Sequence, residues 1–118
     1  QEGKGLLNKN PGRKHLFIKD GPSLTKVLHS EISVIEAYDK YCYIHTQRKK
    51  FMLKERLKNI ADQLPNHLFV QVHRSYIINL EAIDDIQLTQ NKLFVGGKEI
   101  GIGKTYKQTL LSKISTLG

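Results

Sequence analysis

The sequence predicts a mostly β domain of elongated antiparallel sheets, with one short mid-chain helix and a C-terminal helix. Short apolar runs separated by Gly, Pro, Asn and Asp recur along the 118 residues, a pattern typical of strands joined by turns. Only two segments place apolar residues at helical spacing. Because so few helices are available to connect parallel strands, hairpins must make most of the connections.

The N-terminal half is predicted to consist mainly of hairpins. An Asp-Gly-Pro turn signal separates residues 14–19 from residues 24–29, which are interpreted as an opening hairpin. Residues 32–38 are rich in β-branched and aromatic side chains and predict a third strand. A turn at Asp39-Lys40 leads into residues 41–47, whose side chains alternate between two faces. Tyr41, Tyr43 and His45 share one face, and Cys42, Ile44 and Thr46 share the other.

The mid-chain helix is predicted from a change in apolar spacing. A short strand at residues 51–53 leads into a stripe of four apolar residues spaced by four, three and four positions, a spacing typical of one face of a helix, and the first of the four is the last residue of the strand. Pro65 and Asn66 end that helix. The stripe consists of Leu53, Leu57, Ile60 and Leu64.

The C-terminal half returns to strands before a second helix. Residues 69–78 form a long, interrupted apolar stretch. Residues 83–89 and 92–95 flank Gln90-Asn91, which predicts a two-residue hairpin turn. A Gly-Gly turn then leads to a last strand at residues 99–102. The terminal helix carries the stripe Tyr106, Leu110, Ile114 and Leu117.

Length and composition favour a single domain. The 118 residues, 39% of them apolar, suffice for one modest core. Residues 1–13 are polar and are interpreted as a linker or tail, which leaves residues 14–118 as the domain. The single cysteine, Cys42, favours a reducing, cytoplasmic compartment. No apolar run has the length needed to cross a membrane, so no membrane partner is expected.

The charge is both large and unevenly distributed. The formal net charge is +8, which favours a polyanionic partner. Residues 40–58 hold seven Lys or Arg against one acid, Glu55, a net +6, whereas acids collect at Glu81, Asp84 and Asp85. Such segregation is what a phosphate-binding face requires. The alternative is a solvated hairpin tip and helix face that bind nothing.

The sequence offers little support for an enzyme. Residues 97–105 resemble a phosphate-binding loop, but the first Gly is one position too far from the Gly-Lys-Thr. His73 and Ser75 lack a recognisable orienting acid and oxyanion hole for hydrolysis. The five histidines show no metal-ligand spacing with one another or with Cys42. We therefore expect no catalytic residues, no metal and no cofactor.

A long motif in the second half of the chain resembles a known family. Residues 69–80 read FVQVHRSYIINL, and residues 98–106 read KEIGIGKTY. These strings resemble the LytTR (LytR/AlgR-type) DNA-binding domain of bacterial response regulators, with a resemblance covering about residues 15–117. One departure is that Gly103 and Lys104 stand where the family has Ser-Arg. The matching positions are Phe69, His73, Arg74, Ser75, Tyr76, Ile77, Ile78, Asn79, Ile83, Ile100, Ile102 and Tyr106.

The resemblance implies that loops, rather than a recognition helix, enter successive major grooves of duplex DNA. It also implies a two-component system, with an N-terminal receiver domain outside this chain and two copies of the domain on direct-repeat sites. Carried over by motif position, the implied DNA-binding residues come from three loops. They are Asp39, Lys40, Tyr41 and Cys42, then His73, Arg74 and Ser75, and finally Lys104.

The chemistry of these residues agrees with such roles but leaves alternatives open. Arg74 has the rigid fork that suits guanine O6 and N7, or it could pair with an acid of the sheet. Lys40 and Lys104 suit phosphate, or are idle surface cations. Ser75 could bond a phosphate or close its own turn, and Asn79 is interpreted as structural.

The basic tip and the cysteine each allow two interpretations. The basic tip at residues 48–50 adds long-range attraction or faces away from the duplex, and Cys42 is either a buried small hydrophobe or a loop thiol. A second hypothesis for the whole chain is a generic interaction module that binds RNA, an acidic protein or a membrane surface.

Overall fold

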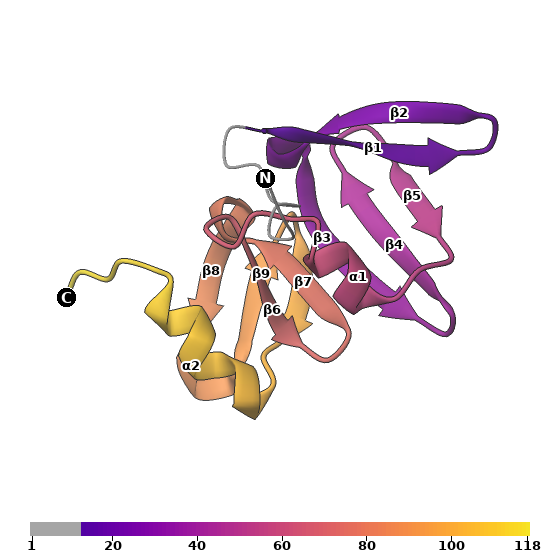
Figure 1. Ribbon diagram of the computed structural model, residues 1–118. Helices are drawn as coiled ribbons and strands as arrows, with labels where there is room; N and C mark the ends of the chain where they lie inside the picture. Colours follow the sequence, from indigo (N-terminus) through magenta and orange to yellow (C-terminus); the bar gives the residue numbers. More distant parts are fainter. Residues whose placement is uncertain (1–12) are drawn as a thin grey trace, which may run out of the picture.

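The computed structural model describes residues 13–118 and confirms a mostly β fold (Figure 1). The predicted N-terminal linker or tail therefore lies, apart from Arg13, outside the described residues. Within the described chain, three antiparallel sheets are accompanied by two α-helices and three short 3-10 turns. No helix in this part of the chain has the length and apolarity that a membrane crossing requires.

The centre of the molecule is a five-stranded sheet with the order β5-β4-β3-β7-β6, in which every neighbouring pair is antiparallel. The pairing of β3 with β7 joins segments about forty residues apart, with Glu36 opposite Tyr76. The strands are β3 (Ile32–Tyr38), β4 (Tyr41–Thr46), β5 (Lys50–Leu53), β6 (Phe69–His73) and β7 (Tyr76–Asn79).

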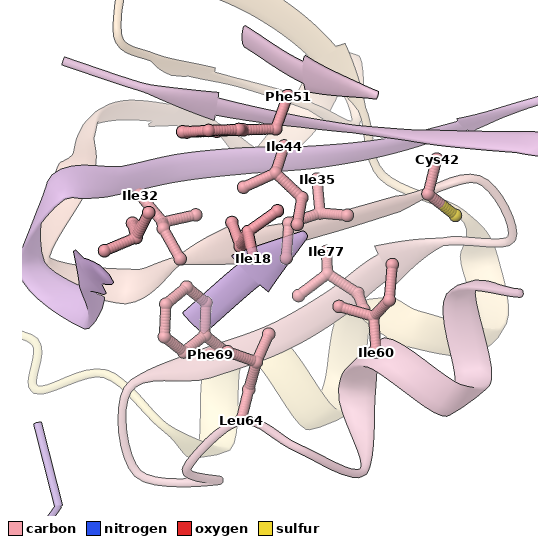
Figure 2. Packing of buried hydrophobic residues seen from close by; sticks show 11 residues of the cluster. Ile18, Ile32, Ile35, Cys42, Ile44, Phe51, Ile60, Leu64, Phe69 and Ile77 are labelled. Atoms are coloured by element: carbon pink, nitrogen blue, oxygen red, sulfur yellow. The ribbon is translucent and has the colours of Figure 1, made fainter. Parts of the chain in front are cut away.

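One face of this sheet is covered by the N-terminal hairpin and the first helix. The predicted opening hairpin is formed by β1 (His15–Asp20) and β2 (Ser23–Leu28), and the 3-10 turn η2 (His29–Glu31) leads from it into the sheet. The helix is α1 (Leu57–Ala61). Figure 2 shows the apolar side chains gathered between these layers. This first core contains Ile18, Val27, Ile32, Ile35, Cys42, Ile44, Phe51, Ile60, Leu64, Phe69 and Ile77.

The opposite face is covered by a three-stranded sheet and the C-terminal helix. The small sheet has the order β10-β9-β8, and α2 (Lys104–Ser112) packs beside β6. Its strands are β8 (Ile83–Gln87), β9 (Lys92–Val95) and β10 (Lys98–Gly101), with the 3-10 turns η3 (Leu80–Ala82) and η4 (Leu88–Gln90) at the ends of β8. This second core contains Val34, Val70, Val72, Ile78, Leu93, Val95, Ile100, Ile102 and Leu110.

The two cores explain why the central strands are apolar at consecutive positions. Ile35 and Ile77 face the first core, whereas their neighbours Val34 and Ile78 face the second. A strand buried on both faces has no position at which a polar side chain would meet water, so its sequence reads as a continuous apolar run. Asn79 is the buried exception, and it satisfies both ends of its amide, as Nδ2 donates to the Ile32 carbonyl at 2.9 Å and Oδ1 accepts from the Glu81 amide at 2.9 Å. This confirms its structural interpretation.

The ends of both predicted helices and one predicted turn differ from the structure. Helix α1 is shorter than its stripe, because it begins at Leu57 and Leu64 lies beyond it in a turn. Leu53 is the last residue of β5 and pairs with Cys42, which confirms the strand predicted at residues 51–53. The predicted two-residue turn at 90–91 is a four-residue connection, since Gln87 pairs with Lys92. A 3-10 turn fills that connection, and Asn91 closes it at φ 52°.

Helix α2 also ends earlier than its stripe predicts. It stops at Ser112, and the last apolar residue of the stripe, Leu117, is fully exposed. Leu110 is the buried contact of the helix. Ile114 is half-buried although it follows the end of the helix, so the apolar spacing beyond Ser112 does not indicate helical structure.

Candidate nucleic-acid interface

Three of the predicted loops meet at one edge of the molecule. Glu36 pairs with Tyr76, and the Ala37 amide donates to the Ser75 carbonyl at 2.8 Å, so the 73–75 loop lies beside the end of β3. The Gly103 amide donates to the Val72 carbonyl at 2.8 Å, which holds the start of α2 beside the end of β6. Figure 1 shows the β3–β4 turn, the β6–β7 loop and the start of α2 along its lower side. We call these three segments, residues 39–40, 73–75 and 103–104, the loop edge.

The β3–β4 turn is a tight hairpin connection. Tyr38 pairs with Tyr41, which leaves Asp39 and Lys40 as a two-residue turn. Asp39 adopts the left-handed conformation at φ 59°, which Asp tolerates better than most residues. Lys40 is exposed and has no hydrogen-bond or ion-pair partner among residues 13–118. Tyr38, 70% exposed, stands beside it and was missed by the sequence analysis, although an aromatic residue at a strand end is a visible signal.

The backbone of the 73–75 loop is held by its neighbours. The Gln71 amide Nε2 donates to the carbonyls of His73 at 3.1 Å and Arg74 at 3.5 Å. The Ser75 amide donates to His73 Nδ1 at 3.1 Å, so the imidazole closes the turn. Against this fixed backbone the Arg74 guanidinium projects into solvent and pairs with no residue of the described chain. The acid partner considered as an alternative for Arg74 is thus not found there.

A carboxylate below the loop supports it from within the sheet. Glu36 lies within 3.3 Å of the Tyr76 hydroxyl, within 3.2 Å of His45 Nε2 and within 3.9 Å of Lys98 Nζ. The Tyr76 ring in turn packs against the His73 ring, with 5.5 Å between the ring centroids. Burial raises the pKa of Tyr76, and the nearby Glu36 charge raises it further. The sequence analysis did not select Glu36. It could have been noticed as the one charged residue of β3.

The start of α2 places the third cation. Lys104 is exposed at the first position of the helix and, within the described chain, has no partner. A lysine there is unfavourable for the helix dipole, so helix stability does not account for it. Gly103 stands where the family has Ser, and the structure places Tyr106 close to it. A Cβ at position 103 would lie 2.9 Å from Tyr106 Cδ2, which is too close for an ordinary contact. The Tyr106 ring therefore occupies the space of a Ser side chain.

A fourth cation lies near the loop edge that the sequence analysis did not select. Leu53 pairs with Cys42 at the start of β4, so the following residue, Lys54, lies at the same end of the sheet as Lys40. Lys54 is exposed, and no residue in the described range is bonded to its ammonium group. The sequence feature that could have identified Lys54 is its position in the basic segment of residues 40–58.

The basic tip at residues 48–50 differs from the loop edge in both position and pairing. It lies at the opposite end of β4 from Lys40. Arg48 Nε is 3.3 Å from Glu31 Oε2, and Lys49 Nζ is 2.7 Å from Asp20 Oδ2. Lys50 Nζ lies over the Tyr43 ring at 5.2 Å. Ion pairs and ring contacts thus engage these cations, and the tip faces away from the loop edge.

Two other predicted groups have clear positions. Cys42 is 1% exposed, its Sγ donates to the Glu55 carbonyl at 3.1 Å, and burial raises the pKa of its thiol. Its side chain therefore belongs to the core and cannot reach a ligand at the loop edge.

Tyr41 is half-buried beside the turn. Within residues 13–118, no three His, Cys, Asp or Glu side chains come together as a metal site would need.

Within residues 13–118, a mostly antiparallel fold thus presents cations without partners along one edge, an arrangement that suits a polyanion such as nucleic acid. The family model of the LytTr DNA-binding domain matches residues 23–115, and the chain belongs to this family. The LytTr DNA-binding domain of a putative methyl-accepting/DNA response regulator from Bacillus cereus has the same fold, with a TM-score of 0.72 and 25% identity. That comparison covers 85% of this chain and 98% of the other.

Curated relatives agree with the family assignment. The sensory transduction protein LytT of Bacillus subtilis (strain 168) is 28% identical over 107 residues, which cover 87% of this chain and 44% of the relative. The transcriptional regulatory protein YpdB of Escherichia coli (strain K12) is 26% identical over 66 residues, 56% of this chain and 27% of that protein. The chain thus spans less than half the length of these relatives.

Proposed function

We propose that this domain binds double-stranded DNA in a sequence-specific manner by inserting the three segments of the loop edge into successive major grooves. The observation that carries the proposal is the contrast between two sets of cations. Lys40, Arg74 and Lys104 have no partner among residues 13–118, whereas Arg48 and Lys49 form ion pairs with acids. Unpaired cations can release counterions from phosphates without first breaking an ion pair.

The roles divide according to side-chain chemistry. Arg74 offers a planar fork of donors on a fixed loop and reads a guanine edge. Lys40, Lys54 and Lys104 are point charges that neutralise phosphates and set the register of the protein on the duplex. His73 and Ser75 flank Arg74, and the Ser75 hydroxyl makes no hydrogen bond within the described chain, which leaves it available to a phosphate oxygen.

We further infer that the domain is a non-enzymatic output module of a two-component response regulator that controls transcription. Two of its relatives are a sensory transduction protein and a transcriptional regulatory protein, which supports this role. In such a protein an N-terminal receiver domain supplies the signal, and two copies of the DNA-binding domain occupy direct-repeat half-sites.

The experiment that tests the proposal is selection of bound sequences from a random duplex library. Enrichment of a repeated short motif supports sequence reading by two copies. The enriched duplex is then compared with scrambled duplex, single strands, RNA and anionic vesicles in equilibrium binding at about 150 mM salt, where the screening length is near 8 Å. Equal retention of all these ligands would favour the generic interaction module instead.

A further inference from the structure

The β1–β2 hairpin has one face in the first core and one face exposed to solvent. Ile18 and Val27 belong to that core, so the residues that alternate with them point outward. Phe17 is 56% exposed, Leu24 is 69% exposed and Leu28 is 42% exposed, and all three lie on this outward face. Scattered apolar side chains on a surface are ordinary, but a group of them on one small face indicates an interaction site. We call Phe17, Leu24 and Leu28 the hairpin patch.

The register of the hairpin makes the hairpin patch continuous. Phe17 pairs with Lys26, which lies midway between Leu24 and Leu28 on β2. Phe17 is therefore a diagonal neighbour of both leucines, at a distance that an aromatic side chain can span. The two leucines are four residues apart, or about 13 Å along the strand. The hairpin patch thus forms a zigzag band that crosses both strands.

Two lysines flank this band on opposite strands. Lys19 pairs with Leu24, and Lys26 pairs with Phe17, so both lysines lie on the outward face. Both are exposed. A ligand that covers the hairpin patch must therefore present negative charge on both sides of its own apolar surface, since charges across an interface have to be complementary.

The acids near the hairpin are engaged by other cations. Asp20 is the one acid of residues 15–28, and its carboxylate accepts a hydrogen bond from Lys49 Nζ at 2.7 Å. Glu31, which follows the hairpin in η2, pairs with Arg48. The outward face of the hairpin consequently keeps the positive charge of its two lysines.

The hairpin patch lies away from the loop edge. The hairpin covers one face of the central sheet, whereas the loop edge lies at the ends of the central strands. Figure 1 shows the hairpin along the upper side of the molecule and the loop edge along its lower side. A ligand on the hairpin patch and a duplex on the loop edge can therefore be bound at the same time.

The dimensions of the outward face match those of a single helix. Two six-residue strands give a face about 20 Å long and about 10 Å wide. An α-helix with its side chains is about 10 Å in diameter, and about thirteen residues span 20 Å. Helix residues i, i+4 and i+8 share one face at steps of about 6 Å. These steps match the successive levels of Leu24, Phe17 and Leu28 along the hairpin.

We propose that the hairpin patch docks an acidic amphipathic helix of a partner protein. Apolar side chains at i, i+4 and i+8 of that helix cover the patch, and Asp or Glu on its flanks approach Lys19 and Lys26. A nucleic acid does not suit this face, because it would leave the apolar band uncovered. The contact is smaller than the roughly 1,200 Å² that stable complexes bury, so binding is reversible and weak. This docking goes beyond the proposed function and requires no DNA.

The experiment uses the full chain and three stapled helical peptides of about fourteen residues. The first has Leu at i, i+4 and i+8 with Glu on both flanks, the second has Lys for Glu, and the third has Ser for Leu. We expect saturable 1:1 binding of the first by calorimetry, with NMR amide shifts centred on β1 and β2. The other two should bind at least about tenfold more weakly. Equal binding of either control peptide, no saturation at about 1 mM, or shifts centred elsewhere would overturn the proposal.

Variants of exposed apolar residues locate the stripe. Phe17→Ser combined with Leu24→Ser should weaken binding of the first peptide by at least about tenfold, because buried aromatic and leucine anchors carry most of such contacts. Met52→Ser is the matched control, since Met52 is 57% exposed but lies on β5, and it should leave the affinity unchanged. A dimer of the free chain in sedimentation that the double variant abolishes would assign the hairpin patch to a second copy and overturn the helix proposal.

Variants of equal charge locate the flanking acids. Lys19→Gln with Lys26→Gln should weaken binding of the first peptide several-fold, whereas Lys40→Gln with Lys104→Gln should not. A saturating amount of duplex should also leave the peptide affinity unchanged. Competition by duplex, or equal weakening by the two pairs of substitutions, would place the peptide on the loop edge or reduce its binding to net charge. Failure of duplex binding alone would count against the proposed function and not against the docked helix.

Discussion

At the scale of single residues, function depends on which side chains are left without an intramolecular partner. Arg74 and Arg48 have the same side chain, but Arg48 is bonded to Glu31 and to the Lys26 carbonyl, whereas Arg74 has no partner in the described chain. The loop that carries Arg74 is itself bonded through Gln71 and His73. A fixed backbone with an unoccupied guanidinium is suited to reading a base, because little order must be gained on binding.

Replacement of Arg74 tests this role directly. Arg74→Ala should cost about 1–3 kcal/mol on the selected duplex and relax specificity at one base position. Arg74→Lys should restore little of the specificity, because an ammonium cannot make the bidentate contact. Fluorescence anisotropy on the selected and point-changed duplexes measures both effects. Arg48→Ala is the matched control and should change the affinity much less. Equal weakening on selected and random duplex would remove the base-reading role.

At the scale of elements, the central strands are stabilised by burial on both faces. Ile35 and Ile78 are both 0% exposed, yet they belong to different cores. The sheet therefore couples the N-terminal hairpin to the C-terminal helix, and it also holds the ends of β3 and β6 from which the loop edge projects. Loss of either core should unfold the same cooperative unit.

Truncation of a core residue on either face tests this coupling. Ile35→Ala and Ile78→Ala should each lower the free energy of unfolding by about 2–5 kcal/mol, because each removes buried methyl groups and leaves a cavity. Urea denaturation should give one transition in both variants. Met52→Ala, at a side chain that is 57% exposed, is the control and should have a small effect. Two separate transitions would show that the cores unfold independently.

The His29 end of the hairpin should make stability sensitive to mild acid. Its pKa is lowered, first by burial and then by His15 and His67, so the unfolded chain binds a proton more readily than the folded chain. Below about pH 6.5 the unfolded state gains that proton and stability falls, by at most about 1.4 kcal/mol per pH unit, until the pH passes the folded-state pKa.

The comparison of the wild type with His29→Gln isolates this effect. His15 and His67, the titratable groups that act on His29, are present in both proteins. The difference in unfolding free energy between pH 7.5 and pH 5.5 should be smaller for the variant. Parallel curves for the two proteins would mean that His29 does not titrate differently on folding.

At the scale of the whole molecule, the distribution of the +8 charge matters more than its size. Lys40, Lys54, Arg74 and Lys104 gather at the loop edge or beside it, and Arg48 and Lys49 are paired with acids at the other end of β4. Cations that are not neutralised by acids at this edge attract a polyanion to it.

Two triple variants with the same loss of charge test the arrangement. Replacement of Lys40, Lys54 and Lys104 by Ala should weaken binding to all duplexes and flatten the slope of log K against log salt by on the order of three units. Replacement of Arg48, Lys49 and Lys50 by Ala should flatten it much less. Affinities measured over a series of salt concentrations give both slopes. Equal slopes for the two variants would place the duplex on another face or make the binding a matter of net charge alone.

The sequence by itself determined the fold class, the order of most strands, the family motif at residues 69–80 and the charge excess. These are local properties, since alternation, turn residues and short motifs involve neighbours in the chain. The tertiary structure decided which cations are available. Lys49 pairs with Asp20, which is 29 positions away in the sequence, and Arg48 pairs with Glu31, which is 17 positions away. No local sequence pattern reveals such pairs.

Contacts between residues that are distant in the sequence also explain the other features that the sequence alone did not reveal. Leu53 fits both the end of a strand and a helical stripe by its position in the sequence, and its pairing with Cys42 decides for the strand. Cys42 itself is buried in the first core. Glu36 supports the Arg74 loop through Tyr76, 40 positions away. His29 is buried against the ring of Phe69, 40 positions away. Contacts between segments distant in the chain depend on how whole elements pack, so only the folded structure determines them.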